Sequence, residues 1–140
     1  MYVDDLIITS NNDDHIEQVK KELHAGFKMT DLGLLHYYLR VEVFQRPHQI
    51  FISQGKYAAE FIQQFGMQDC KPVLTPMEQN FKLSKFEGGE KVDNTTYRQL
   101  IGSMIYLTTT RPDLSYAVNI LSRFMQEPLD SHWNATKRVL

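Results

Sequence analysis

The sequence predicts an α+β chain whose strands lie in its first 53 residues and whose remainder is mainly helical. Short runs rich in apolar and strand-forming residues occur at 6–8, 37–44 and 49–53. Farther along the chain, apolar residues recur every three or four positions, which is the period of an amphipathic helix. A segment rich in glycine and charge, residues 76–93, separates two such regions. These observations predict a small antiparallel sheet followed by a helical region.

Length and composition set the bounds of the fold and of its partners. At 140 residues the chain has room for one domain or two small lobes. Hydrophobic residues make up 42%, which is enough for a core and argues against general disorder. The formal net charge is −2, from 15 basic and 17 acidic residues. A stand-alone binder of phosphate backbones is usually basic, so composition alone does not favour that class.

Cysteine usage and hydropathy indicate an intracellular protein. Cys70 is the single cysteine, which excludes an internal disulfide and a cysteine-based zinc cluster. We expect it to be a packed or surface thiol. Acidic residues at positions 4 and 5 disfavour a secretory signal, and no apolar stretch approaches the ~20 residues of a membrane span. The prediction is a protein of the cytoplasm or nucleus, without a membrane partner and not secreted.

The first predicted elements are a strand and a helix. Residues 1–10 should form a strand whose buried part is 6–8. Turn residues follow at 11–14, and Asp14 with Glu17 fits a capping box. The spacing of a calcium-binding loop is missing, so the cap interpretation is preferred there. A helix over 14–28 is predicted by one apolar stripe, formed by Ile16, Val19, Leu23 and Phe27.

Two strands and a short helix follow. The segments 37–44 and 49–53 are predicted strands, joined across a turn that contains Pro47. A helix over 56–65 should be capped by Ser53 or Gln54 and end at Gly66. Its apolar stripe is expected in the core rather than as a base-stacking platform, because it repeats at helical spacing. The stripe consists of Tyr57, Phe61, Ile62 and Phe65.

After the linker, two further helices are predicted over 97–108 and 112–125. The Arg111-Pro112 step separates them, and Thr110 with Asp113 suits the start of the second. Pro128 ends it, and a last helix runs toward residue 140. The second helix carries a regular apolar stripe, formed by Leu114, Ala117, Val118, Leu121, Phe124 and Met125. We expect this region to be structural, since no motif for chemistry accompanies it.

The candidate site is Tyr2-Val3-Asp4-Asp5, directly before the apolar run Leu6-Ile7-Ile8. Aspartate is depleted in strands, so two adjacent carboxylates here need a reason. A tight hairpin would hold both acids at its turn, where they could bind Mg²⁺, a cation that prefers oxygen ligands. The alternative is a polar β-turn whose acids are simply solvated. Four residues do not decide between the two.

Several further blocks follow the motif in order along the chain. The blocks are Met29–Leu39, Ile50–Tyr57, Phe65–Val73, Thr75–Met77, Tyr97–Ser103 and Thr110–Val118. Each block is weak alone, whereas their shared order and spacing are specific. Together with the motif, the series resembles the reverse transcriptase of copia-type LTR retrotransposons, particularly those of plants, over essentially the whole chain.

The resemblance implies RNA-directed DNA polymerase activity and a role for each motif residue. Asp4 would ligate the catalytic Mg²⁺ ions, with Asp5 as its partner acid. Tyr2 would lie by the primer terminus, and Val3 would contact the nucleic acid. The implied partners are an RNA or DNA template-primer, a deoxynucleoside triphosphate and the rest of a Pol polyprotein.

The resemblance also implies a domain organisation. Residues 1–53 would be the C-terminal part of the polymerase palm, 54–75 a thumb-like helical segment, 76–93 a linker, and 94–140 a connection toward an RNase H domain. In the family, the fingers and a third metal-binding Asp precede the motif. The chain is therefore expected to be a fragment that binds Mg²⁺ weakly or not at all and is inactive alone.

Two other functions stay open at this stage. The chain could be a non-enzymatic retroelement remnant that acts, if at all, as an interaction protein. It could also be a small metal-dependent hydrolase that uses Asp4 and Asp5, although no histidine or further carboxylate motif accompanies them.

One departure from the family pattern is Arg40, which follows Leu39 where family members carry a glycine. A glycine within a strand often marks a bulge or a close backbone approach. Arg40 would obstruct such an approach, unless its side chain points to solvent or toward a phosphate. Sequence drift in a decaying copy is the favoured explanation.

Overall fold

The computed structural model describes residues 5–77, 83–84 and 88–140. The chain divides into two compact units, Met1–Leu35 and His36–Leu140. Helices and a small antiparallel sheet are both present, so the predicted α+β class is confirmed. Part of the predicted linker, residues 78–82 and 85–87, lies outside the described residues. On its described flank, Lys91 forms an isolated antiparallel bridge with Leu129.

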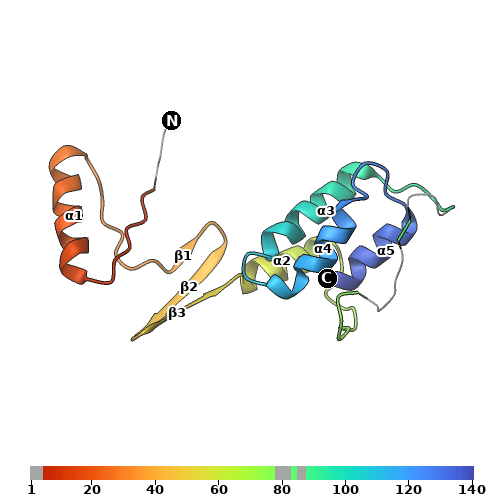
Figure 1. Cartoon of the computed structure of the whole chain (residues 1–140), viewed down its shortest axis with the longest axis horizontal. Helices are drawn as coiled ribbons and strands as arrows, with labels where there is room; N and C mark the ends of the chain where they lie inside the picture. Colours follow the sequence, from red (N-terminus) through yellow and green to blue (C-terminus); the bar gives the residue numbers. More distant parts are fainter. Residues whose placement is uncertain (1–4, 78–82, 85–87) are drawn as a thin grey trace. The chain divides into compact units, whose positions relative to one another are not determined.

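The first unit is built around α1, Asp13–Gly26 (Figure 1). Its cap is Asn12 rather than the predicted Asp14: the Asn12 Oδ1 accepts the Asp14 backbone N–H at 2.9 Å. The helix ends two residues before the predicted position, since Phe27 has extended backbone. The strand predicted over 1–10 is wrong for its described part, because residues 5–10 pair with no other described strand.

The second unit begins with a sheet of three antiparallel strands in the order β1-β2-β3 among the described residues. They are β1 Tyr37–Tyr38, β2 Val41–Arg46 and β3 Gln49–Ser53 (Figure 1). The prediction of β3 is confirmed residue for residue. The single strand predicted over 37–44 is wrong, because the chain reverses between Tyr38 and Val41, which pair with each other.

That reversal is a two-residue hairpin turn formed by Leu39 and Arg40. Both have left-handed backbone, with φ of 46° and 63°, as a type I′ turn requires. Asn-Gly is the usual pair there because side chains with a Cβ are strained in this region. A glycine at position 40 would thus serve the turn, not the bulge or close approach considered from sequence. The Leu39 carbonyl accepts a hydrogen bond from the Tyr106 hydroxyl.

Helix α2, Gly55–Gln64, follows the sheet and is capped mainly from outside its own sequence. Gln54, at the N-cap position, makes no side-chain cap bond. The Ser53 hydroxyl accepts the Gly55 N–H at 3.1 Å, and the Glu42 carboxylate accepts the Lys56 N–H at 3.2 Å. These two acceptors satisfy N–H groups that have no partner within the helix.

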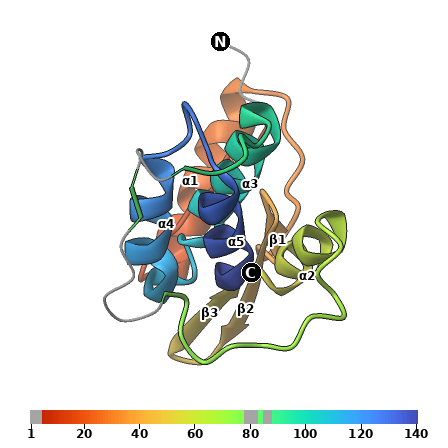
Figure 2. The same cartoon turned by 90° about the vertical axis from the view of Figure 1, so that its right-hand side faces the viewer.

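Three further helices and one short turn of 3-10 helix complete the unit: α3 Asn94–Leu107, η1 Pro112–Leu114, α4 Ser115–Ser122 and α5 Asp130–Val139 (Figure 2). With α2 they enclose the core. Its largest fully buried side chains include Tyr97, Phe61, Leu100, Ile101 and Met104. Burial of Tyr57 and Phe61 confirms the core interpretation of the aromatic stripe. Inside the core the Tyr97 hydroxyl donates to the Leu121 carbonyl at 3.0 Å.

Polar contacts join the sheet to the helices within the second unit. Besides the Tyr106–Leu39 bond, the Thr110 hydroxyl donates to Oε1 of the buried Gln54 at 2.8 Å. This pairing replaces the predicted role of Thr110 at the start of the next helix. Since these bonds link residues far apart in sequence, they hold the sheet against α3 as one packed unit.

Candidate active site

Of the four motif residues, only Asp5 belongs to the described part of the chain. Tyr2, Val3 and Asp4 lie outside the described residues. Asp5 is exposed, and so are the next two residues, whereas Ile8 is partly buried. The predicted burial of the apolar run after the motif is therefore limited to its last residue.

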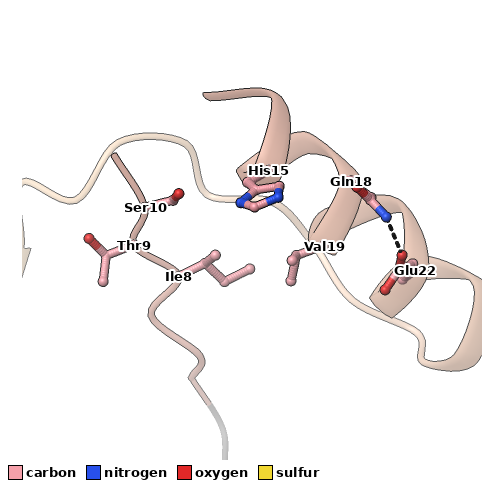
Figure 3. A pocket seen from close by; sticks show the side chains of 7 residues that line it. All are labelled: Ile8, Thr9, Ser10, His15, Gln18, Val19 and Glu22. Atoms are coloured by element: carbon pink, nitrogen blue, oxygen red, sulfur yellow. Dashed lines mark hydrogen bonds between the residues drawn. The ribbon is translucent and has the colours of Figure 1, made fainter. Parts of the chain in front are cut away.

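Ile8 is partly buried because it faces α1. Residues 8–10 and one side of α1 line a hollow of about 270 Å³ (Figure 3). In this hollow Ile8 extends toward Val19, and Thr9 points to the other side. His15 lies beside Ser10, and the Gln18 amide donates to the Glu22 carboxylate at 2.9 Å. The hollow follows the motif by only a few residues and mixes apolar with polar groups.

The acidic segment that follows residues 8–10 lies at the start of α1. Asp13 and Asp14 occupy the first turn of α1, where negative charge is favoured by the helix dipole. Among residues 5–77, 83–84 and 88–140, no group of three His, Cys, Asp or Glu side chains could hold a metal ion.

A surface network of ion pairs and one hydrogen bond connects α1 to the segment that follows it. The Lys20 ammonium lies 3.0 Å from both the Glu17 and Asp31 carboxylates. The pKa of Asp31 is lowered first by the Gly33 N–H, which donates to it at 2.8 Å, and then by Lys20. Gly33 can take this position because its φ is 77°, in the left-handed region that glycine tolerates. The network ties the segment after α1 back to the helix.

Two cations in the second unit lie where the sheet meets α2. The Arg40 guanidinium lies 5.3 Å from the centre of the Tyr57 ring and 3.7 Å from the Glu60 carboxylate. Lys56 lies 3.8 Å from the Glu42 carboxylate, and both cations keep more than half of their side-chain surface exposed. Arg40 therefore points along the surface of α2, and exposed cations of this kind can also contact phosphate.

Glu42 is a structural position that sequence reasoning missed. The Glu42 side chain caps an N–H that lies 14 residues away in sequence. No local sequence motif therefore predicts this cap. The signal that could have found it is Gly55, because a Cβ at that position would lie 3.2 Å from the Glu42 Oε2. Glycine allows the carboxylate to approach the start of α2.

The helical end of the chain holds one buried titratable side chain of note. His132 is fully buried, stacks on Phe124 with ring centroids 3.8 Å apart, and accepts the Leu129 N–H at Nδ1. These contacts identify His132 as a structural residue of α5. Searched over the described residues, the chain contains no helix long and apolar enough to cross a membrane.

Comparison with known proteins gives a consistent result. The family model described as reverse transcriptase (RNA-dependent DNA polymerase) matches residues 1–79. Two Arabidopsis thaliana proteins, the retrovirus-related Pol polyproteins from transposons RE2 and RE1, are 42% and 41% identical over all 140 residues. An uncharacterized mitochondrial protein of the same plant is 38% identical over the whole chain. No solved structure matches the chain significantly.

The matches also show how the chain relates in length to its relatives. It spans 10% of each of the two Pol polyproteins and 58% of the mitochondrial protein. The matched family segment includes the four motif residues, α1, the sheet and α2. The helices α3 to α5 lie beyond it, but they are covered by the longer matches.

Proposed function

This chain belongs to the reverse transcriptase (RNA-dependent DNA polymerase) family, and from that membership we propose that it supplies part of the polymerase of a copia-type transposon Pol polyprotein. The observation that carries the proposal is the family match over residues 1–79, which includes the Asp4–Asp5 pair. Its second support is the likeness to plant transposon polyproteins over the whole chain.

In this proposal Asp4 and Asp5 are the metal-binding carboxylates of the polymerase. Two adjacent carboxylates are hard oxygen donors, which suits Mg²⁺. Asp4 is the direct ligand and Asp5 its partner acid. Tyr2 lies by the primer terminus, and Val3 contacts the nucleic acid from the same turn. When bound, Mg²⁺ stabilises negative charge on the reacting phosphate.

The reaction is nucleotidyl transfer on a template-primer. The primer 3′-hydroxyl gives up its proton to water, and its oxygen forms a new P–O bond with the α-phosphate of a deoxynucleoside triphosphate. The P–O bond from the α-phosphorus to the bridging oxygen breaks, and pyrophosphate leaves. The motif carboxylates position the reacting groups, and correct positioning alone can supply several kcal/mol of the barrier reduction. The partners are the RNA or DNA template-primer, the incoming nucleotide and the rest of the polyprotein, inside the cell.

The proposed organisation follows the chain. Residues 1–53 form the C-terminal part of the palm, 54–75 a thumb-like segment that includes α2, 76–93 a linker, and 94–140 a connection toward an RNase H domain. Arg40 and Lys56 lie where this palm part meets the thumb-like helix. Their exposure makes them available to a duplex that follows α2.

A graft tests the proposal. Residues 1–79 replace the matching segment of the transposon RE2 polyprotein, and extension of a labelled primer on an RNA template is measured with Mg²⁺. We expect template-dependent extension that Asp4→Asn abolishes. Asp69→Asn removes an exposed aspartate within the same matched segment and serves as the control. A graft whose extension survives Asp4→Asn would contradict the assigned site.

The isolated 140-residue chain is expected not to extend a primer with either Mg²⁺ or Mn²⁺. Phosphoryl transfer needs ligands fixed in line with nucleophile and leaving group, and an error of ~1 Å can cost ~100-fold. Calorimetry should give no micromolar Mg²⁺ binding that depends on Asp4. Extension by the isolated chain that vanishes in Asp4→Asn would make it a minimal polymerase.

A further inference from the structure

Strand β3 is an open edge of the sheet in the second unit. Among the described residues, β3 pairs with β2 on one side and with no strand on the other. Ile50, Phe51 and Ile52 keep 68%, 65% and 47% of their surface exposed. The β2–β3 hairpin projects from the helices (Figure 1). The strand thus offers unpaired backbone groups together with apolar side chains.

This edge lacks the protection that isolated proteins usually build into exposed strands. A lysine, a proline or a bulge commonly prevents an edge strand from pairing with another chain. The five residues of β3 carry no charge and no proline. Their pairing with β2 runs without interruption from Arg46–Gln49 to Glu42–Ser53, so no bulge twists the strand away. Such an edge is a template for another strand.

The sequence of β3 indicates which strand fits it. Gln-Ile-Phe-Ile-Ser is almost a palindrome, and antiparallel pairing reverses one of the two partners. Two copies centred on Phe51 would place Phe51 opposite Phe51, Ile50 opposite Ile52, and Gln49 opposite Ser53. Apolar residues then meet apolar ones, polar meet polar, and no like charges are opposed.

We propose that β3 pairs antiparallel with β3 of a second copy of this chain, which joins two three-stranded sheets across a two-fold axis. Phe44 already lies opposite Phe51 on one face, with ring centroids 6.1 Å apart. The pairing continues this row into four phenylalanines, two from each copy. On the other face the Val43–Ile52 row continues into Ile50 of the second copy. Identical patches meeting in this way form a closed, isologous dimer.

The dimer is weak, because its contact is one strand wide. Five residues on each side bury less than the ~1,000 Å² expected of a stable interface. Association is therefore reversible and depends on concentration. Sedimentation equilibrium from about 10 μM to about 1 mM should show a shift from monomer to dimer, the range in which such weak interfaces are populated.

A charge on the strand tests the surface. Phe51→Lys opposes two cations across the two-fold axis and should weaken dimerisation by about tenfold or more. Ile105→Lys is the matched control, since Ile105 is 49% exposed and belongs to α3, not to β3. It should leave the dissociation constant of the dimer unchanged. A wild type that stays monomeric throughout, or equal effects of the two variants, would overturn the proposal.

Cysteine cross-linking tests the register. In a Cys70→Ser background, Phe51→Cys should oxidise to a covalent dimer, because this residue faces itself across the axis. Ile50→Cys should not cross-link alone, but it should do so when mixed with Ile52→Cys. If Ile50→Cys alone forms dimers as readily as Phe51→Cys, the strands pair in another register or not at all, and the proposal fails.

Discussion

Helices α1 and α3 have the same length, 14 residues, yet they differ completely in burial. None of the 14 residues of α1, all within the described part of the chain, is buried. Five residues of α3 are buried: Tyr97, Leu100, Ile101, Met104 and Leu107. Both helices have a side-chain cap, from Asn12 and Asp93. Length and capping therefore do not explain the difference in burial. The difference depends on whether the apolar stripe of each helix packs against other elements.

The difference teaches where the stability of the chain resides. Short helices in water depend on packing of an apolar face more than on propensity. The stripe of α3 packs against other helices, whereas that of α1 meets no core among the described residues of its unit. The segment next to the proposed catalytic acids is thus the least supported, and the best-packed segment has no proposed chemistry.

The largest expected effect comes from truncating each stripe. Leu100→Ala should lower the free energy of unfolding by about 3 kcal/mol, from lost burial and the cavity that remains. Leu23→Ala in α1 should cost less than ~1 kcal/mol, since its side chain is only partly buried. Urea titration followed by Trp133, the single tryptophan, measures the loss in the second unit, and amide exchange in α1 measures the loss in the first. Equal losses of stability in the two variants would contradict the comparison.

Substitutions in the hairpin turn at Leu39 and Arg40 should have a smaller effect on the free energy of unfolding, and of opposite sign. Leu39→Asn with Arg40→Gly should raise the free energy of unfolding by ~1 kcal/mol, because two strained left-handed residues are relieved. Arg40→Ala loses the contacts with Tyr57 and Glu60 but keeps the strain, so it should destabilise slightly. The gain should appear in the Trp133 transition and leave amide exchange in α1 unchanged. If Arg40→Gly destabilises as much as Arg40→Ala, the contacts outweigh the strain.

The smallest expected effect is on the loss of stability at acidic pH. The pKa of Asp93 is lowered because the Thr96 hydroxyl and N–H donate to its carboxylate, at 2.6 and 2.8 Å. A carboxyl whose pKa falls on folding stabilises above its unfolded value, here 3.8, and that stability is lost as the pH falls through the lower folded value. Urea titrations at about pH 5 and about pH 3 should show a smaller acid loss in Asp93→Asn than in wild type.

Asp31→Asn provides the matched control for the acid prediction. The pKa of Asp31 is lowered too, but Asp31 lies in the first unit. Its substitution should leave the acid dependence of the Trp133 transition unchanged and alter only amide exchange near α1. A change in that transition would mean that the two units unfold together.

The elements predicted from sequence were those with strong local signals. Residues 49–53 contain three consecutive strand-forming residues, Ile50 to Ile52, after the turn that contains Pro47, and the strand prediction there was confirmed. The Tyr57–Phe65 stripe predicted both α2 and its buried face. The break at Arg111-Pro112 is present, because proline begins the short 3-10 turn.

The elements that sequence reasoning missed depend on distant partners or on competing local preferences. Strand-forming residues on both sides of Leu39 and Arg40 hid a turn whose usual Asn-Gly pair is absent. The Glu42 cap depends on a residue 14 positions away. The roles of Asp4 and Asp5 rest on motif and family, and they stay predictions that the graft can test.

The Tyr106 bond to the Leu39 carbonyl also sets an order of events during synthesis. It joins residues 67 positions apart, and contacts so distant form late because closing the intervening loop costs entropy. Helices α3 to α5 contact one another within a short stretch and can assemble first. At ~5–20 residues per second, the sheet waits about 3 to 13 seconds for Tyr106 to be made. During that interval the exposed β3 edge is present before the helices of its unit have folded. Its apolar residues are then most accessible to a chaperone.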